Sequence, residues 1–100
     1  MSEKSALSEG EKLTLLKQDL QMLTNSNDDF LLMLLNMSDA FVKREGIQDD
    51  GGIEYCGIQI QYAAYLFRKR AGTETSMPRF LRWEMNNLLF SQKSKAGDST

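Results

Sequence analysis

The side chains that usually perform catalysis or hold metal ions are almost missing from this chain of 100 residues. It has no histidine and a single cysteine, Cys56. A zinc site, a Ser-His-Asp triad and a Cys-His pair all need residue types that this sequence lacks. We therefore expect no catalytic residues, no metal ligands and no cofactor, and we interpret Cys56 as a small buried residue. The sequence predicts a protein that is not an enzyme.

Cationic and aromatic side chains near the C-terminus are the remaining candidates for binding chemistry. The cations of this cluster are Arg68, Lys69, Arg70, Arg79 and Arg82. They flank a break that resembles a helix-turn-helix, which suggests DNA binding, but the formal net charge of −2 argues against a duplex binder. The simpler interpretation is helix termination and pairing on the surface. Trp83 is a candidate anchor residue of a protein interface, and the simpler interpretation is that it packs in the core.

Composition and charge are typical of one folded domain. Hydrophobic residues make up 41% of the chain and charged residues 26%. Residues 1–50 carry five cations and ten anions (net −5), whereas residues 51–100 carry seven cations and four anions (net +3). These halves can neutralise each other within one chain or between copies. The opening residues lack a signal-peptide pattern and the longest apolar run is six residues, so we expect cytoplasmic synthesis and no membrane insertion.

Four apolar segments separated by polar or glycine-containing breaks predict a compact all-α bundle of about four helices. Ser8 and Glu11 have capping-box spacing, and Gly46 and Gly72 follow basic residues as helix stops do. The predicted helices cover residues 9–23, 28–45, 53–71 and 78–90. The alternation over residues 58–62 leaves a strand as an alternative there. We expect a flexible polar leader over residues 1–8, a helical domain over 9–90 and a flexible polar tail over 91–100.

The second predicted helix has more apolar residues than one buried face requires. The predicted buried stripe consists of Phe30, Met33, Leu34, Met37 and Phe41. Leu32 lies opposite this stripe, so the helix is either central in the bundle or buried a second time by a partner. Together with the cationic cluster, this gives a set of candidate protein-interface residues. They are Leu32, Arg68, Arg70, Arg79, Arg82 and Trp83.

Over residues 13–90 the chain resembles the small head-tail connector (adaptor) proteins of long-tailed bacteriophages. The most distinctive stretches are residues 62–70 (YAAYLFRKR), 77–83 (MPRFLRW) and 86–90 (NNLLF). Weaker support comes from residues 15–20, from Asp28 and Asp29 before the leucine run, and from residues 42–47. The resemblance implies a helical bundle that forms a ring, typically dodecameric, below the portal and extends the DNA channel. It offers no catalytic residues.

The resemblance implies further partners and a location. The portal protein would bind one side, and a downstream connector or tail-completion protein the other. Genomic DNA would pass through the channel without sequence-specific binding. The protein would be found in the virion neck, and in the host cytoplasm during assembly. The alternative is a small helical DNA-binding regulator that uses Arg79 and Arg82.

Overall fold

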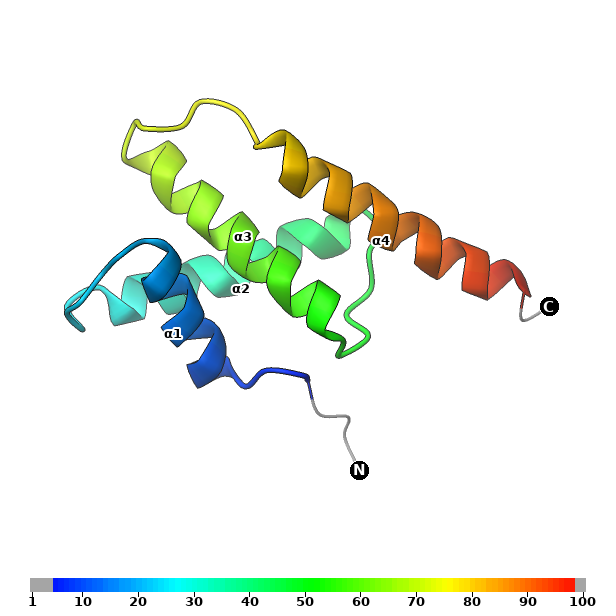
Figure 1. Cartoon of the computed structure of the whole chain (residues 1–100), viewed down its shortest axis with the longest axis horizontal. Helices are drawn as coiled ribbons and strands as arrows, with labels where there is room; N and C mark the ends of the chain where they lie inside the picture. Colours follow the sequence, from blue (N-terminus) through cyan, green and yellow to red (C-terminus); the bar gives the residue numbers. More distant parts are fainter. Residues whose placement is uncertain (1–4, 99–100) are drawn as a thin grey trace.

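Four helices follow one another along the chain in the computed structural model, which describes residues 5–98 (Figure 1). They are α1 (Glu9–Asp19), α2 (Asp28–Arg44), α3 (Ile53–Arg70) and α4 (Arg79–Asp98). No strand occurs within the described residues, so the prediction of an all-α bundle is confirmed. Residues 58–62, for which a strand was the alternative, lie inside α3.

Helix α3 is the central element, because it packs against each of the other three helices. In Figure 1 it runs diagonally through the middle of the molecule, with α2 crossing behind it. Two core clusters lie along it. The first joins the C-terminal part of α2 to α3 and α4 through Val42, Ile47, Tyr55, Ile58, Tyr65, Leu81, Met85 and Leu88. The second joins α1 and α2 to α3 through Leu16, Leu31, Leu34, Leu35, Ile60, Ala63 and Ala64.

Most of the predicted helix ends are present. The Ser8 side chain accepts from the backbone N–H of Glu11, and the Glu11 carboxylate accepts from the backbone N–H of Ser8, which completes the capping box. Gly46 (φ +97°) and Gly72 (φ +84°) adopt the left-handed conformation that ends a helix. At the start of α2, Asn27 occupies the N-cap position, but its side chain makes no capping hydrogen bond.

Helix α1 ends at Asp19, so the prediction that it reaches Leu23 is wrong. Gln21 takes a positive φ of 59°. The N–H of Met22 donates to the carbonyl of Lys17, and that of Gln21 to the carbonyl of Gln18. This is a Schellman ending with glutamine where glycine is usual, so the sequence shows no stop signal. Leu23 is left 97% exposed.

Helix α4 continues to Asp98, so its predicted end at Phe90 is wrong and helix occupies most of the predicted tail. Residues 99–100 of that tail lie outside the described residues. The segment is polar, but residues 91–96 contain no glycine or proline that would break a helix. Gln92 also ties the helix to the loop after α2. Its side chain donates to the carbonyl of Gln48 and accepts from the N–H of Gln48, both at 2.8 Å.

The buried face of α2 differs from the predicted stripe. The buried residues are Leu31, Leu34, Leu35, Ser38 and Val42. Met33 and Met37 are instead exposed, at 45% and 38%. Since α3 occupies the centre of the bundle, the surplus apolar surface of α2 is not explained by a central position.

The predicted leader is partly attached to the bundle. Residues 1–4 lie outside the described residues. From Ser5 onwards the chain makes contacts: the Ser5 hydroxyl lies 3.1 Å from the Cys56 sulfur, and the N–H of Ala6 donates to the carbonyl of Gly51. Leu7 is half-buried against the second core cluster. Cys56 is fully buried, as predicted.

Candidate interaction surfaces

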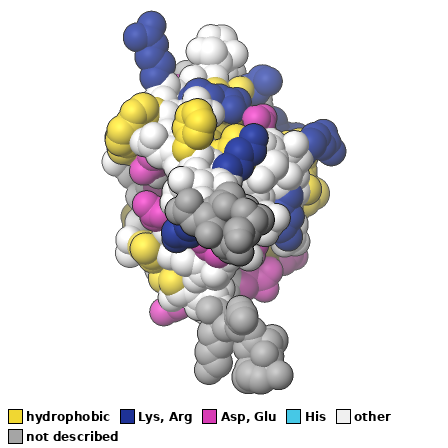
Figure 2. Space-filling view, turned by 90° about the vertical axis from the view of Figure 1, so that its right-hand side faces the viewer, with side chains coloured by type: hydrophobic (Ala, Val, Ile, Leu, Met, Phe, Trp, Pro, Cys, Tyr) yellow, Lys and Arg dark blue, Asp and Glu magenta, His cyan; other side chains and the backbone are white. Residues whose placement is uncertain are grey.

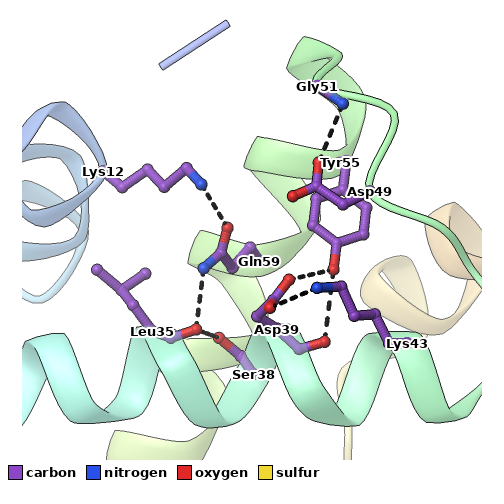
Figure 3. A network of polar contacts seen from close by, with 9 residues as sticks. All are labelled: Lys12, Leu35, Ser38, Asp39, Lys43, Asp49, Gly51, Tyr55 and Gln59. Carbon is purple, nitrogen blue, oxygen red and sulfur yellow. Dashed lines mark hydrogen bonds and ion pairs between the residues drawn. The ribbon is translucent and has the colours of Figure 1, made fainter. Parts of the chain in front are cut away.

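A polar network holds α2 against α3 in a fixed register (Figure 3). The Tyr55 hydroxyl donates to the carboxylate of Asp39 at 2.5 Å, and Lys43 pairs with the same carboxylate at 3.0 Å. Gln59 donates to the carbonyl of Leu35 and accepts from the ammonium group of Lys12, which adds α1 to the network. Because these contacts link three helices, they restrict sliding of one helix along another.

The network shifts the pKa values of Tyr55, Asp39 and Lys43. Burial raises the pKa of Tyr55, and the hydrogen bond to Asp39 raises it further, so the hydroxyl remains a donor at neutral pH. Partial burial would raise the pKa of Asp39, but the hydrogen bonds from Tyr55 and Lys43 outweigh it and lower that pKa. The hydrogen bond to Asp39 and its negative charge raise the pKa of Lys43. These shifts follow from contacts that hold the helices together.

The outer side of α4 carries large aromatic side chains that the core does not use. Phe80, Trp83 and Phe90 are 61%, 59% and 73% exposed. Their spacing places them along one side of the helix, and the rings of Phe80 and Trp83 stack with centroids 5.7 Å apart. Figure 2, which looks onto the side where α4 ends, shows hydrophobic side chains reaching the surface among charged ones. Apolar surface rimmed by charges is typical of interaction sites.

A groove of about 380 Å³ runs between α3 and α4 beside these aromatic residues. Trp83 forms one wall, and Ile53, which is 60% exposed, lies on the other. The carboxylates of Glu54 and Glu84 also line it. We call this groove, together with Phe80 and Phe90, the α4 face.

A second apolar surface, which α3 covers only in part, lies on α2. It consists of Phe30, Met33, Met37 and Phe41, and we call it the α2 face. Its methionines are exposed and its phenylalanines half-buried. Cations lie over both rings: the guanidinium of Arg70 is 5.1 Å from the Phe30 centroid, and that of Arg44 is 5.4 Å from the Phe41 centroid.

The predicted arginines do not converge on one site. Arg68 pairs with Asp19 and Arg82 with Glu45, in both cases at 3.3 Å. Each pair joins an anion from residues 1–50 to a cation from residues 51–100. This is what neutralisation of the two halves within one chain predicts. Arg79 is exposed.

The two apolar candidates have different environments. Trp83 is exposed, so core packing is excluded for it, and its role as an interface anchor stays a prediction. Leu32 is half-buried against the second core cluster, on the other flank of α2 from the α2 face.

Sequence reasoning missed several members of these surfaces. The spacing of Phe80, Trp83 and Phe90 was a detectable signal, because it repeats at helical intervals on the side opposite Met85. Met33 and Met37 were recognised as apolar but assigned to the core. Choosing between two apolar sides of α2 requires knowing where α3 lies.

Within residues 5–98, no group of three or more acidic, histidine or cysteine side chains is placed to hold a metal ion. None of the helices in this part of the chain has the length and hydropathy that a membrane span needs. No protein-family model, no curated protein and no solved structure matches the sequence or fold of this chain. The surfaces described above are therefore the structural basis on which a function can be proposed.

Proposed function

We propose that this protein is a structural head-tail connector (adaptor) of a long-tailed bacteriophage. In this role it forms a ring below the portal, extends the DNA channel and joins the capsid to the tail. The observation that carries the proposal is the α4 face: Phe80, Trp83 and Phe90 are exposed while the core beneath them is complete without them. Aromatic residues at this exposure favour a protein that works by binding other proteins.

Ring assembly explains how individually weak contacts can give a stable complex. The α4 face has few large side chains, and solvent-exposed charge pairs formed with a partner would contribute little affinity. A single contact of this kind is therefore weak. Closing a ring on a portal that offers repeated sites makes many such contacts at once and raises the effective concentration of each. The portal would bind one side of the ring and a downstream connector or tail-completion protein the other.

Charge pairing speaks against the alternative of a DNA-binding regulator. Two arginines of the cationic cluster, Arg68 and Arg82, already pair with Asp19 and Glu45. Their charges are partly neutralised before a phosphate could approach. Affinity for duplex DNA rises with the number of phosphates that cations neutralise, so paired arginines contribute less to it.

The test of the adaptor role is assembly on the portal protein from the same phage. Light scattering after size-exclusion chromatography should give a monomer or weak oligomer for the isolated protein. Addition of the portal should produce a ring, and cryo-electron microscopy of the virion should place the same chain in the neck. A tight two-fold dimer whose assembly does not change when portal is added would contradict the proposal. So would a virion neck that does not contain this chain.

A binding assay with short duplex DNA tests the alternative. The adaptor should bind it negligibly in about 150 mM salt, where exposed charges more than about 8 Å apart are largely screened. Submicromolar binding that falls steeply with salt, and that Arg79→Ala/Arg82→Ala abolishes, would favour the regulator instead.

A further inference from the structure

Helix α2 has two apolar sides. The monomer buries one of them and covers the other only in part, where Phe30 packs against Phe67 and Phe41 against Tyr62. The side formed by Leu31, Leu35 and Val42 is buried against the other helices. The α2 face lies about 135° away around the helix axis, on a side that no other helix covers completely. The exposed thioethers of Met33 and Met37 lie at its centre. Flexible methionine side chains adapt their shape to the surface that covers them.

The α4 face lies on a different side of α3. Tyr55, Gln59 and Tyr62 contact α2, whereas Glu54 and Gly57 line the groove. In an ideal helix these two sets of residues are about 130° apart. The two apolar faces therefore point in different directions, and two copies can bring one face of each together while the other face of each remains free.

The guanidinium groups over the α2 face and the carboxylates that line the groove of the α4 face carry opposite charges. Arg44 and Arg70 flank the α2 face, and neither takes part in an ion pair among residues 5–98. The α4 face presents the carboxylates of Glu54 and Glu84. Glu84 accepts a hydrogen bond from Gln61 at 2.6 Å, and within the described chain Glu54 has no cationic partner. Two α2 faces would bring these arginines together and two α4 faces these carboxylates, whereas a contact between unlike faces brings the arginines to the carboxylates.

We propose that the occupant of the α2 face is a second copy of this chain, whose α4 face docks on it. The contact is heterologous, since different surfaces of the two copies meet. Such a contact leaves one face free at each end and adds further copies until the rotation closes a ring. The inference rests on the ring-forming adaptor proposed above and names the surfaces by which neighbouring copies bind.

Two single substitutions separate the faces. Met37→Glu places a carboxylate in the centre of the α2 face and leaves the α4 face intact. Trp83→Glu does the reverse. Leu23→Glu is the matched control, because Leu23 is also exposed but belongs to neither face. All three positions are solvent-accessible, so the variants should melt like the wild type when followed by circular dichroism.

Sedimentation velocity from about 10 μM to about 1 mM measures association over the range of weak interfaces. We expect the wild type and Leu23→Glu to associate beyond a dimer as concentration rises. Each face variant alone should lose at least about thirtyfold in association constant, as loss of a central anchor does. An equimolar mixture of Met37→Glu and Trp83→Glu should form one-to-one dimers and stop there, because each copy retains the face that the other lacks.

Recovery in the mixture is the result that a two-fold dimer cannot give, because a self-complementary interface is damaged in both partners. If the wild type associates but the mixture does no better than either variant alone, the inference is overturned. It is also overturned if both face variants form rings on the portal as readily as Leu23→Glu does. If the wild type is monomeric without portal, the inference is supported when both face variants fail to form rings on the portal and Leu23→Glu forms them.

The outcomes of these experiments distinguish failure of the docking inference from failure of the adaptor proposal. Normal rings formed by both face variants would remove the inference and leave the adaptor proposal standing. One-to-one dimers of the complementary variants, combined with no binding to the portal, would support the docking of the α4 face on the α2 face and contradict the adaptor proposal.

Discussion

The hydrogen bond between Tyr55 and Asp39 provides the sharpest test of how the bundle is held together. Tyr55→Phe removes one oxygen and keeps the ring, which is fully buried in the first core cluster. The hydroxyl that is lost donates to the carboxylate of Asp39. Hydrogen bonds to charged groups contribute about 1.5 to 3 kcal/mol to stability.

The lower end of that range applies here. The Asp39 side chain retains 29% of its accessible surface and keeps its contact with Lys43, so water and the ammonium group compensate in part. We expect Tyr55→Phe to lower the free energy of unfolding by about 1.5 kcal/mol, which corresponds to a Tm decrease of roughly 6 to 12 °C for a domain of this size. Thermal and urea unfolding followed by circular dichroism measure both quantities.

Tyr65→Phe is the matched control. Tyr65 is also buried, and among the described residues its hydroxyl donates no hydrogen bond like that of Tyr55. The same deletion there should change stability by less than about 0.5 kcal/mol. Equal effects of the two substitutions, or a change below about 2 °C for Tyr55→Phe, would refute the argument that this hydrogen bond stabilises the packing of α2 on α3.

Three further outcomes are expected. Asp39→Asn should be less stable than the wild type at pH 7. Because folding lowers the pKa of Asp39 from 3.8, the ionised carboxylate stabilises the wild type above that pH, and the difference should shrink as acid protonates the folded state; a gap that stays constant in acid-unfolding curves would contradict this. Leu32→Asp should lower the Tm, since a carboxylate would replace a leucine half-buried against the core, and an unchanged melting curve would show that this packing is unimportant. Gly46→Ala should destabilise the protein by about 1 kcal/mol or more, because Gly46 has a positive φ. Gly57→Ala inside α3 should stabilise it by up to about 1 kcal/mol, because an added Cβ meets nothing within 4 Å there. If urea unfolding gave the two stability changes the same sign, this explanation from backbone conformation would be contradicted.

Local signals in the sequence determined most of the helices. The capping box of Ser8 and Glu11 and the glycines Gly46 and Gly72 act through contacts within a few residues, so they can be recognised without the fold. Helix ends that lack such signals were misplaced. α1 stops at a left-handed Gln21, and α4 continues past Phe90 through a segment in which Gln92 contacts the distant Gln48.

The sequence by itself predicted an all-helical bundle, with a strand as the alternative only over residues 58–62. It also determined how apolar each segment is, and that α2 has more apolar surface than one buried face needs. The tertiary structure decided which side of each helix is buried. Periodicity specifies the angle between side chains on one helix but not the direction in which the neighbouring helices lie. For that reason Met33 and Met37 were assigned to the core and lie on the surface. Trp83, for which core packing was the simpler interpretation, lines an exposed groove beside two carboxylates, because α3 contacts the opposite flank of α4.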